Sequence, residues 1–152
     1  GLGDVYKRQV VAQPGVTNLA ITHAVQNKGF YYAPDPSSQI ACSVGGNVAE
    51  NSGGVHCLKY GLTTNNLLGI EFVTIEGEVL RLGGKHLDSG DYDLMGVMTG
   101  SEGLLGIVSE VTLRILQKPA TQRALLVRFD DTAAAATAVG NVIGAGIIPA
   151  GM

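Results

Sequence analysis

The chain has no tryptophan, and aromatic residues make up only 5% of its 152 residues. Charged residues are also scarce, at 15% against roughly 25% in an average soluble domain. The formal net charge is −3, and no basic block occurs anywhere in the chain. Nucleic-acid-binding proteins typically carry a basic patch, and single-strand binders need aromatic stacking platforms. The composition therefore argues against a nucleic-acid partner.

Long apolar runs and cysteine frameworks are missing as well. Every apolar stretch is interrupted by glycine or charge, so none reaches the roughly 20 residues of a transmembrane helix. Residues 1–9 lack the apolar core of a signal peptide. Cys42 and Cys57 are too few for a disulfide framework or a four-ligand zinc site. We expect reduced thiols, no transmembrane segment and a cytoplasmic location, with any membrane association arising through partner subunits.

Glycine, by contrast, is abundant: there are 22 glycines in 152 residues, about twice the roughly 7% of an average protein. The chain has the length of one domain, and its 45% apolar content is enough for a core. The glycines follow no collagen-like period. They indicate tight turns and close approaches of the backbone.

The first half of the chain predicts short elements separated by turns. Residues 10–15 predict a strand that ends in a Pro-Gly turn. Apolar residues at helical spacing predict a helix that Thr17 caps and Gly29 ends. We expect residues 30–33 to be extended and residues 46–51 to form a short helix.

The second half predicts a hairpin and two further short elements. Two apolar runs within residues 67–82 flank the turn Glu76-Gly77 and predict a β-hairpin. A polar loop at 83–91 and a short helix at 92–98 come next. Residues 106–116 alternate like a strand, with one face formed by Ile107, Ser109, Val111, Leu113 and Ile115.

The pattern changes after Lys118-Pro119. Residues 125–129 predict a strand, followed by an alanine-rich helix that Asp130 or Asp131 caps and that ends near Ile143. Its apolar face carries Val139, Val142 and Ile143, and Gly144 and Gly146 end it. This strand–helix pair indicates a second domain that starts at residue 119. Residues 1–9 do not join naturally to the rest of the chain and are interpreted as a non-native leader; we expect further sequence on both sides of the chain.

The run from Pro34 to Gly61 carries the chemistry. It contains two prolines in Pro34-Asp-Pro-Ser-Ser38, and then two Gly-Gly pairs, in 42–47 and 50–54. Glycines allow amide N–H groups to converge into an anion nest, and prolines fix a loop before a ligand arrives. An isolated Gly-Gly-Asn is most simply a turn, whereas this combination favours a ligand site. Rossmann and P-loop glycine patterns are absent from the sequence.

A resemblance identifies the ligand. The run PDPSSQIACSVGGNVAENSGGVHCLKYG closely resembles the flavin-binding stretch of the glycolate oxidase and FAD-linked D-2-hydroxyacid (D-lactate) dehydrogenase family. That family belongs to the vanillyl-alcohol oxidase superfamily, whose FAD-binding domain is of the PCMH (p-cresol methylhydroxylase) type. TGSEGLLGIVSEVTLRIL resembles the family's second signature, and GVTNLAI and GIIPAGM also fit. The resemblance covers residues 10–152.

The resemblance implies an α+β fold. Residues 10–118 would form the second subdomain of a PCMH-type FAD-binding domain, with an antiparallel-rich sheet flanked by helices. Residues 119–152 would form the first β-α unit of the C-terminal FAD-linked oxidase (substrate) domain. The cofactor-binding residues that it implies fall in both runs: Pro34, Asp35, Pro36, Ser38, Ser43, Gly45, Gly46, Asn47, Asn51, Gly53, Gly54, Tyr60 and Gly61 in the first, and Glu102, Gly103, Gly106, Ile107 and Val108, beside the adenosine half, in the second.

The intact enzyme is then expected to oxidise a D-2-hydroxy acid, glycolate or D-lactate, by hydride transfer to the flavin, and to pass electrons to a partner subunit with an iron–sulfur centre. Nothing like the family's phosphate loop precedes Val10, and the substrate domain only begins in this chain, so we assign no catalytic residue and no metal ligand and expect the fragment alone to be inactive. The alternatives are a reductase of the UDP-N-acetylenolpyruvoylglucosamine type, which the first run fits less well, or a non-catalytic or inert truncated flavin-binding module.

Several other residues invite functional interpretations. We favour a structural or solvent-facing role for His56 over a flavin-linking base, and a small buried apolar role for Cys42 over a covalent flavin ligand. Lys59 either contacts a phosphate or is solvated. His23 and His86 have no partners at metal-ligand spacing, and the hairpin carboxylates are expected to form its solvated face: Glu71, Glu76 and Glu78.

Overall fold

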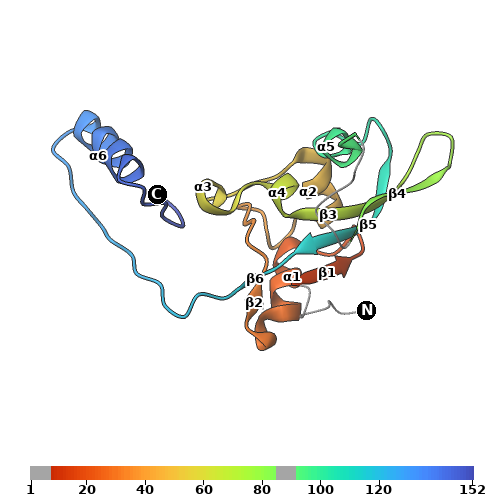
Figure 1. The fold of residues 1–152 in the computed structure, drawn as a ribbon, viewed down its shortest axis with the longest axis horizontal. Helices are drawn as coiled ribbons and strands as arrows, with labels where there is room; N and C mark the ends of the chain where they lie inside the picture. Colours follow the sequence, from red (N-terminus) through yellow and green to blue (C-terminus); the bar gives the residue numbers. More distant parts are fainter. Residues whose placement is uncertain (1–7, 85–91) are drawn as a thin grey trace.

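The chain forms an α+β structure in a computed structural model that describes residues 8–84 and 92–152 (Figure 1). Its centre is a four-stranded antiparallel sheet with the strand order β1-β5-β3-β4. The strands are β1 (Gln9–Ala12), β5 (Ile107–Arg114), β3 (Leu67–Val73) and β4 (Val79–Gly83). Gly77 turns the chain between β3 and β4 with φ +82°, which only glycine adopts without strain. The predicted hairpin is confirmed.

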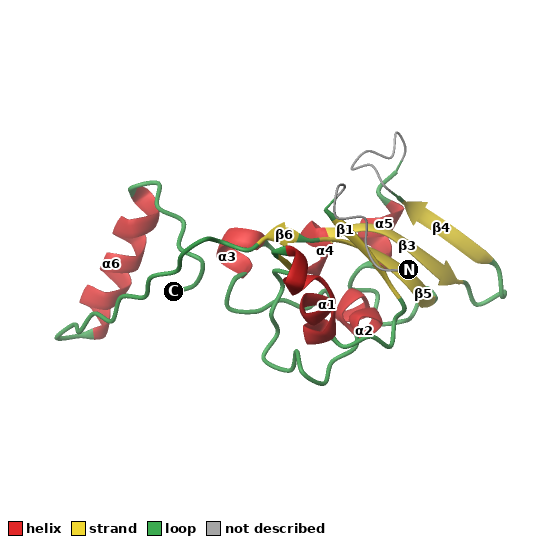
Figure 2. Ribbon diagram, turned by 90° about the horizontal axis from the view of Figure 1, so that it is seen from below, coloured by secondary structure: helices red, strands yellow, loops and turns green. Residues whose placement is uncertain are grey.

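Two helices cover one face of this sheet (Figure 2). They are α1 (Asn18–Val25), which a 3₁₀ turn at Gln26–Lys28 extends, and α2 (Val44–Glu50). Gly29 ends the first helix with φ +79°, as its position predicts. The remaining elements of the body are short: α3 (Cys57–Tyr60), α4 (Thr63–Asn66), α5 (Leu94–Met98), and a two-stranded antiparallel pair of β2 (Phe30–Tyr31) with β6 (Leu116–Gln117).

The core lies between α1, α2 and the sheet. Ile21 of α1 and Val44 and Val48 of α2 are buried, and they share one apolar cluster with Val111 and Leu113 of β5. These residues are the inward positions of amphipathic elements, so their burial excludes water from a continuous apolar layer. The helix predicted at 46–51 is present but starts at Val44.

A β-bulge corrects the predicted face of β5. Val111, Leu113 and Ile115 point into the core as expected, but Ile107 is 74% exposed. The register between β3 and β5 shifts after Glu71, which faces Glu110, so that Phe72 faces Val108. A bulge inserts one residue and so moves the following side chains to the opposite face. Val108 therefore packs against the core, and the Ser109 hydroxyl group donates to Glu71 at 2.8 Å.

The C-terminal segment leaves the body after β6 and forms α6 (Thr132–Gly144) (Figure 1). The chain then returns to the body, where a Cβ on Gly151 would lie 2.6 Å from Val55 Cγ1. Asp131, one of the two candidate caps, caps α6 by accepting the Ala134 N–H at 2.7 Å. The strand predicted at 125–129 is wrong: these residues, all of them described, form no strand, and Leu125 and Leu126 are fully solvent-exposed. A strand needs a neighbour for its backbone hydrogen bonds, and none lies beside this segment in the described chain.

Two further boundaries differ from those predicted. Gln9 belongs to β1, where it pairs with Arg114, and the Arg8 carbonyl accepts the Ile115 N–H at 2.9 Å. Residues 8 and 9, which the sequence pattern assigns to the leader, thus take part in the sheet. The leader's residues 1–7, the polar-loop residues 85–91 and His86 lie outside the described residues. The helix predicted at 92–98 spans only Leu94–Met98.

Candidate cofactor site

The backbone N–H groups in the first turn of α2 donate to acceptors within the protein, so they do not form an open anion nest. Ser43 caps the helix, and its Oγ accepts the Gly46 N–H at 3.3 Å. The N–H groups of Val44 and Gly45 donate to the carbonyls of Val16 and Pro14, each at 2.9 Å. A Cβ on Gly45 would lie 2.6 Å from the Pro14 Cβ. This glycine is therefore needed for packing, and its role toward a cofactor stays a prediction.

The side chain of Asn47 also makes its hydrogen bond within the protein. Its side chain is buried, and Nδ2 donates to Asn18 Oδ1 at 2.9 Å. Asn18 Nδ2 in turn donates to the Pro34 carbonyl at 2.8 Å. Two buried amides thus link α2 through α1 to the start of the proline loop. Because buried amides must be paired, these bonds fix where the loop of residues 34–38 begins.

The second Gly-Gly pair lies directly against that loop. A Cβ on Gly54 would overlap the backbone carbonyl of Asp35, and a Cβ on Gly53 would lie 2.5 Å from Cys57 Sγ. Asn51 ends α2 in the left-handed conformation, with φ 49°, and its Oδ1 accepts the Thr64 N–H at 3.0 Å. The structure thus places the loop of residues 34–38 against Gly54 through Asp35. We call the surface formed by residues 34–38 and 53–57 the cofactor wall.

Open hydrogen-bond donors occur at this wall. Among the described residues, the backbone N–H groups of Gly53 and Val55 have no recorded acceptor. The Tyr32 hydroxyl group is buried and also lacks a partner within the described chain. Its neighbour, the Thr63 hydroxyl, donates instead to the Ser52 carbonyl at 2.7 Å. Burial raises the pKa of Tyr32 above its usual range, so the hydroxyl remains a donor at neutral pH.

Ionisable and aromatic side chains gather beside these donors. Asp35 Oδ2 lies 2.6 Å from His56 Nδ1, and Asp35 Oδ1 accepts the His56 N–H at 3.3 Å. The Tyr60 ring meets the Tyr31 ring edge-on, with centroids 6.2 Å apart, and Lys59 Nζ lies 5.6 Å from the Tyr60 centroid. Burial, and then the neighbouring Tyr60 hydroxyl, raise the pKa of Tyr31 above its usual range. His56 thus contacts Asp35 and is partly exposed, and the structural or solvent-facing role expected for it stays a prediction.

The second run packs against the end of α2. The N–H groups of Gly100 and Glu102 donate to the carbonyls of Val48 and Ala49 at 2.8 and 2.9 Å. Glu102 and Gly103 both have positive φ, 55° and 78°. A Cβ on Gly106 would lie 2.7 Å from the Val73 carbonyl oxygen. Gly106 is therefore required by the close approach of β3, whether or not a ligand also lies there.

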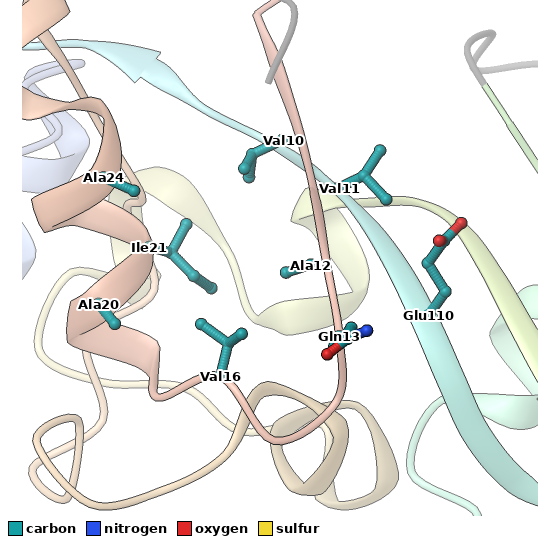
Figure 3. Close-up of a pocket in the computed structure, with 9 residues that line it drawn as sticks. All are labelled: Val10, Val11, Ala12, Gln13, Val16, Ala20, Ile21, Ala24 and Glu110. Carbon is teal, nitrogen blue, oxygen red and sulfur yellow. The ribbon is translucent and has the colours of Figure 1, made fainter. Parts of the chain in front are cut away.

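A separate cavity of about 350 Å³ lies between β1 and α1 (Figure 3). Val10 and Ala12 of β1, Ile21 of α1 and Val16 in the turn between them point into it. None of the residues predicted to bind the cofactor lines this cavity. Its small apolar walls include Ala20 and Ala24, which share one face of α1.

Residues 8–84 and 92–152 offer neither a metal site nor a membrane span. That part of the chain contains no cluster of three or more potential ligands for a metal ion. No helix in it is both long and apolar enough to cross a bilayer. Cys42 and Cys57 are free thiols, and Cys42 is half-buried rather than fully buried as expected. Cys57 Sγ accepts the Gly54 N–H at 2.9 Å.

The sequence did not single out Tyr32 or Val55. The doublet Tyr31-Tyr32 before the prolines indicated only extended backbone, because an alternating pattern of two residues cannot tell which ring is buried. Val55 offers a backbone amide, and no side-chain signal marks an open amide. The buried hydroxyl and the two open amides suit a cofactor that is rich in acceptors, such as FAD, whose pyrophosphate and ring edge both accept hydrogen bonds.

The chain is similar in sequence to several known proteins. The chain is 59% identical over 145 residues to "Glycolate oxidase subunit GlcD" of Escherichia coli (strain K12), which covers 95% of this chain and 29% of the relative. The Bacillus subtilis (strain 168) protein of the same name is 46% identical over 91% of this chain and 30% of the relative. "D-lactate dehydrogenase" of Anaerostipes hadrus is 36% identical over 80% of this chain and 26% of the relative. The chain therefore spans less than a third of the length of these relatives.

Solved structures and a family model agree with these relatives. An alkyldihydroxyacetonephosphate synthase matches with a TM-score of 0.80 and 24% identity, over 97% of this chain and 26% of that chain. This likeness concerns the fold alone, and it confirms the predicted fold class. The model described as "FAD binding domain" matches residues 3–83, just over half of the chain. The chain belongs to this family of FAD-binding domains, whose cofactor is FAD.

Proposed function

We propose that this chain is part of an FAD-dependent oxidoreductase that oxidises a D-2-hydroxy acid, glycolate or D-lactate, and that it contributes one wall of the FAD site. The observation that carries the proposal is the 59% identity to a glycolate oxidase subunit over 95% of the chain, which includes both signature runs. The similarity to a D-lactate dehydrogenase supports the same substrate class. The chain would be inactive without the rest of the enzyme.

The residues of this chain would bind and orient the cofactor. The amides of Gly53 and Val55 and the Tyr32 hydroxyl would donate hydrogen bonds to its acceptor atoms. The Asn47–Asn18–Pro34 chain of hydrogen bonds would hold the proline loop in place before binding, which lowers the ordering cost. When bound, FAD supplies the hydride acceptor, and the protein supplies position and electrostatics.

The remaining residues implied by the resemblance belong to the same proposal. Pro34 to Ser38, Ser43 to Asn47 and Asn51 to Gly61 would line the flavin and pyrophosphate half. Residues 102–108 would lie along the adenosine half, where exposed Ile107 offers a side chain for contact. Residues 10–118 would belong to the FAD-binding domain and residues 119–152 to the substrate domain.

The proposal extends to partners and location. The word "subunit" in the names of two relatives supports assembly with other chains, and an iron–sulfur subunit would accept the electrons. A cytoplasmic location would follow for such an assembly.

A second candidate is an inert flavin-binding fragment. It is favoured by the exposed side chains of Leu125 and Leu126, at 91% and 102%, and by the use of the first-turn amides of α2 within the protein. Such a chain would retain the fold without holding the cofactor. The two candidates differ in whether the chain alone binds FAD.

Titration of the purified chain with FAD separates them. Saturable quenching of flavin fluorescence, with weaker binding of riboflavin, is the expected result because riboflavin lacks the pyrophosphate and adenosine that the wall would contact. An unchanged flavin spectrum at saturating protein would contradict FAD binding by this chain. Turnover of glycolate or D-lactate by the chain alone would contradict the view that catalytic groups lie elsewhere in the enzyme.

A further inference from the structure

Asp35 and His56 are joined by two hydrogen bonds across 21 positions of sequence. The carboxylate Oδ2 lies 2.6 Å from the imidazole Nδ1, and Oδ1 accepts the backbone N–H of His56 at 3.3 Å. Both carboxylate oxygens of Asp35 therefore accept hydrogen bonds from the same residue, His56. The His56 side chain is 40% exposed and that of Asp35 is 21% exposed. Partial burial makes this contact stronger than a fully solvated surface pair.

This contact joins two segments that already lie backbone to backbone. The loop of residues 34–38 carries Asp35, and the segment of residues 53–57 carries His56. Gly54 lies so close to the Asp35 carbonyl that no Cβ would fit. The open amides of Gly53 and Val55 lie in this second segment. A shift of His56 would therefore move the donors on either side of Gly54.

The geometry also fixes the imidazole tautomer. A carboxylate is only an acceptor, so Nδ1 must carry the proton. Nε2 has no recorded hydrogen bond within the described chain. The other polar groups nearby are the Lys59 ammonium and the hydroxyls of Tyr60 and Tyr31. None of them competes with Asp35 for Nδ1.

We propose that Asp35 and His56 form a positioning pair that fixes the proline loop against residues 53–57 and so presents the amides of Gly53 and Val55 to the cofactor. The pair acts through the Nδ1–H bond to Asp35, and His56 makes no essential contact through Nε2. This inference rests on the proposed FAD site for its consequence in binding, whereas the ordering of the two segments can be measured without cofactor.

Amide replacements separate the two imidazole nitrogens. In His56→Asn, the side-chain NH₂ lies near the place of Nδ1 and can still donate to Asp35. In His56→Gln, the NH₂ lies nearer to the place of Nε2, and the bond to Asp35 is lost. His56→Ala and Asp35→Ala remove the pair from either side, and Glu78→Gln, at the exposed hairpin turn, is the control.

Two measurements are made on each variant. Hydrogen exchange of residues 53–57 without cofactor reports the order of the segment, and FAD titration reports affinity. We expect His56→Ala, His56→Gln and Asp35→Ala each to speed exchange and to weaken FAD binding about tenfold, the loss of one charge-assisted bond. His56→Asn should stay within about twofold of the unaltered chain. The double alanine variant should lose no more than Asp35→Ala alone, because that change already removes both the side-chain bond and the bond from the His56 backbone N–H.

The outcomes distinguish this inference from the proposed function. Retained FAD affinity in His56→Gln together with loss in His56→Asn would assign the effect to Nε2 and overturn the positioning role. Equal exchange in all variants would overturn it as well. If the unaltered chain binds no FAD but the exchange pattern appears as expected, the positioning pair stands and the proposed cofactor function of this chain fails.

Discussion

The buried side-chain amide of Asn47 donates to the buried carbonyl oxygen of Asn18 at 2.9 Å, and Asn18 passes the connection on to Pro34. Asn47 lies in the stretch that the resemblance assigns to cofactor contacts, yet its side chain holds the scaffold beneath the proline loop. A residue in a cofactor-binding signature can thus contribute to binding without touching the cofactor, by holding the loop that does.

Replacing Asn47 with Ala should therefore destabilise the fold. The change leaves Asn18 Oδ1 buried without a donor, which costs about 1–3 kcal/mol. Denaturant unfolding followed by circular dichroism measures the loss. Asn141→Ala, at an exposed position of α6, is the matched control and should change stability by less than about 0.5 kcal/mol. Equal stability of both variants would show that the Asn47–Asn18 bond contributes nothing.

Because of the bulge in β5, truncation of two neighbouring residues should destabilise the fold to different extents. Val108 packs against the core, whereas Ile107 is 74% exposed. Val108→Ala should cost about 1–2 kcal/mol through lost packing, and Ile107→Ala should cost less than about 0.5 kcal/mol. The free energy of unfolding of each variant tests this. A larger loss for Ile107→Ala would mean that β5 follows regular alternation and that no bulge shifts its register.

Tyr32→Phe should separate stability from binding. The hydroxyl group is buried and lacks a partner in the described chain, so its removal should leave stability unchanged or raise it by up to about 1 kcal/mol. FAD affinity should fall several-fold if the hydroxyl donates to the cofactor. Thermal unfolding and FAD titration are measured on the same sample. A marked loss of stability in the variant would reveal a protein partner for the hydroxyl.

Glu71 should stabilise the fold at neutral pH and lose this contribution in acid. Hydrogen bonds from Ser109 and then Arg81 lower the pKa of the Glu71 carboxyl from its ordinary value. A depressed folded-state pKa stabilises the fold above the unfolded-state value, and this contribution is lost as the pH falls through the folded-state value. The melting temperature of the unaltered chain should exceed that of Glu71→Gln at pH 7.

The pH dependence of that difference is the decisive measurement. The difference between the two chains should shrink below the roughly pH 4.3 of an ordinary glutamate, as the carboxyl becomes protonated. Glu76→Gln, at the exposed end of the hairpin, should show no such trend. A constant difference over this range would rule out the carboxylate charge as its source.

Local patterns in the sequence were enough to predict several turns, helix ends and caps of this protein. Glycines and apolar periodicity predicted the hairpin at 67–82, the helix that Gly29 ends and the Asp131 cap of α6, because turns and caps depend on a few adjacent residues. The glycine and proline spacing in residues 34–61 marked the candidate site, and the resemblance carried by that run predicted the family that the comparisons confirm.

The tertiary structure decided which groups in that run are free to bind. Whether an amide is open depends on carbonyls that come from distant segments, as Val16 and Pro14 do for the start of α2. The contact between Asp35 and His56, the bulge before Val108 and the missing strand at 125–129 likewise depend on neighbours that no local pattern specifies. The first run thus remains the candidate site, with the amides of Gly53 and Val55 and the neighbouring Tyr32 hydroxyl as candidate donors to the cofactor.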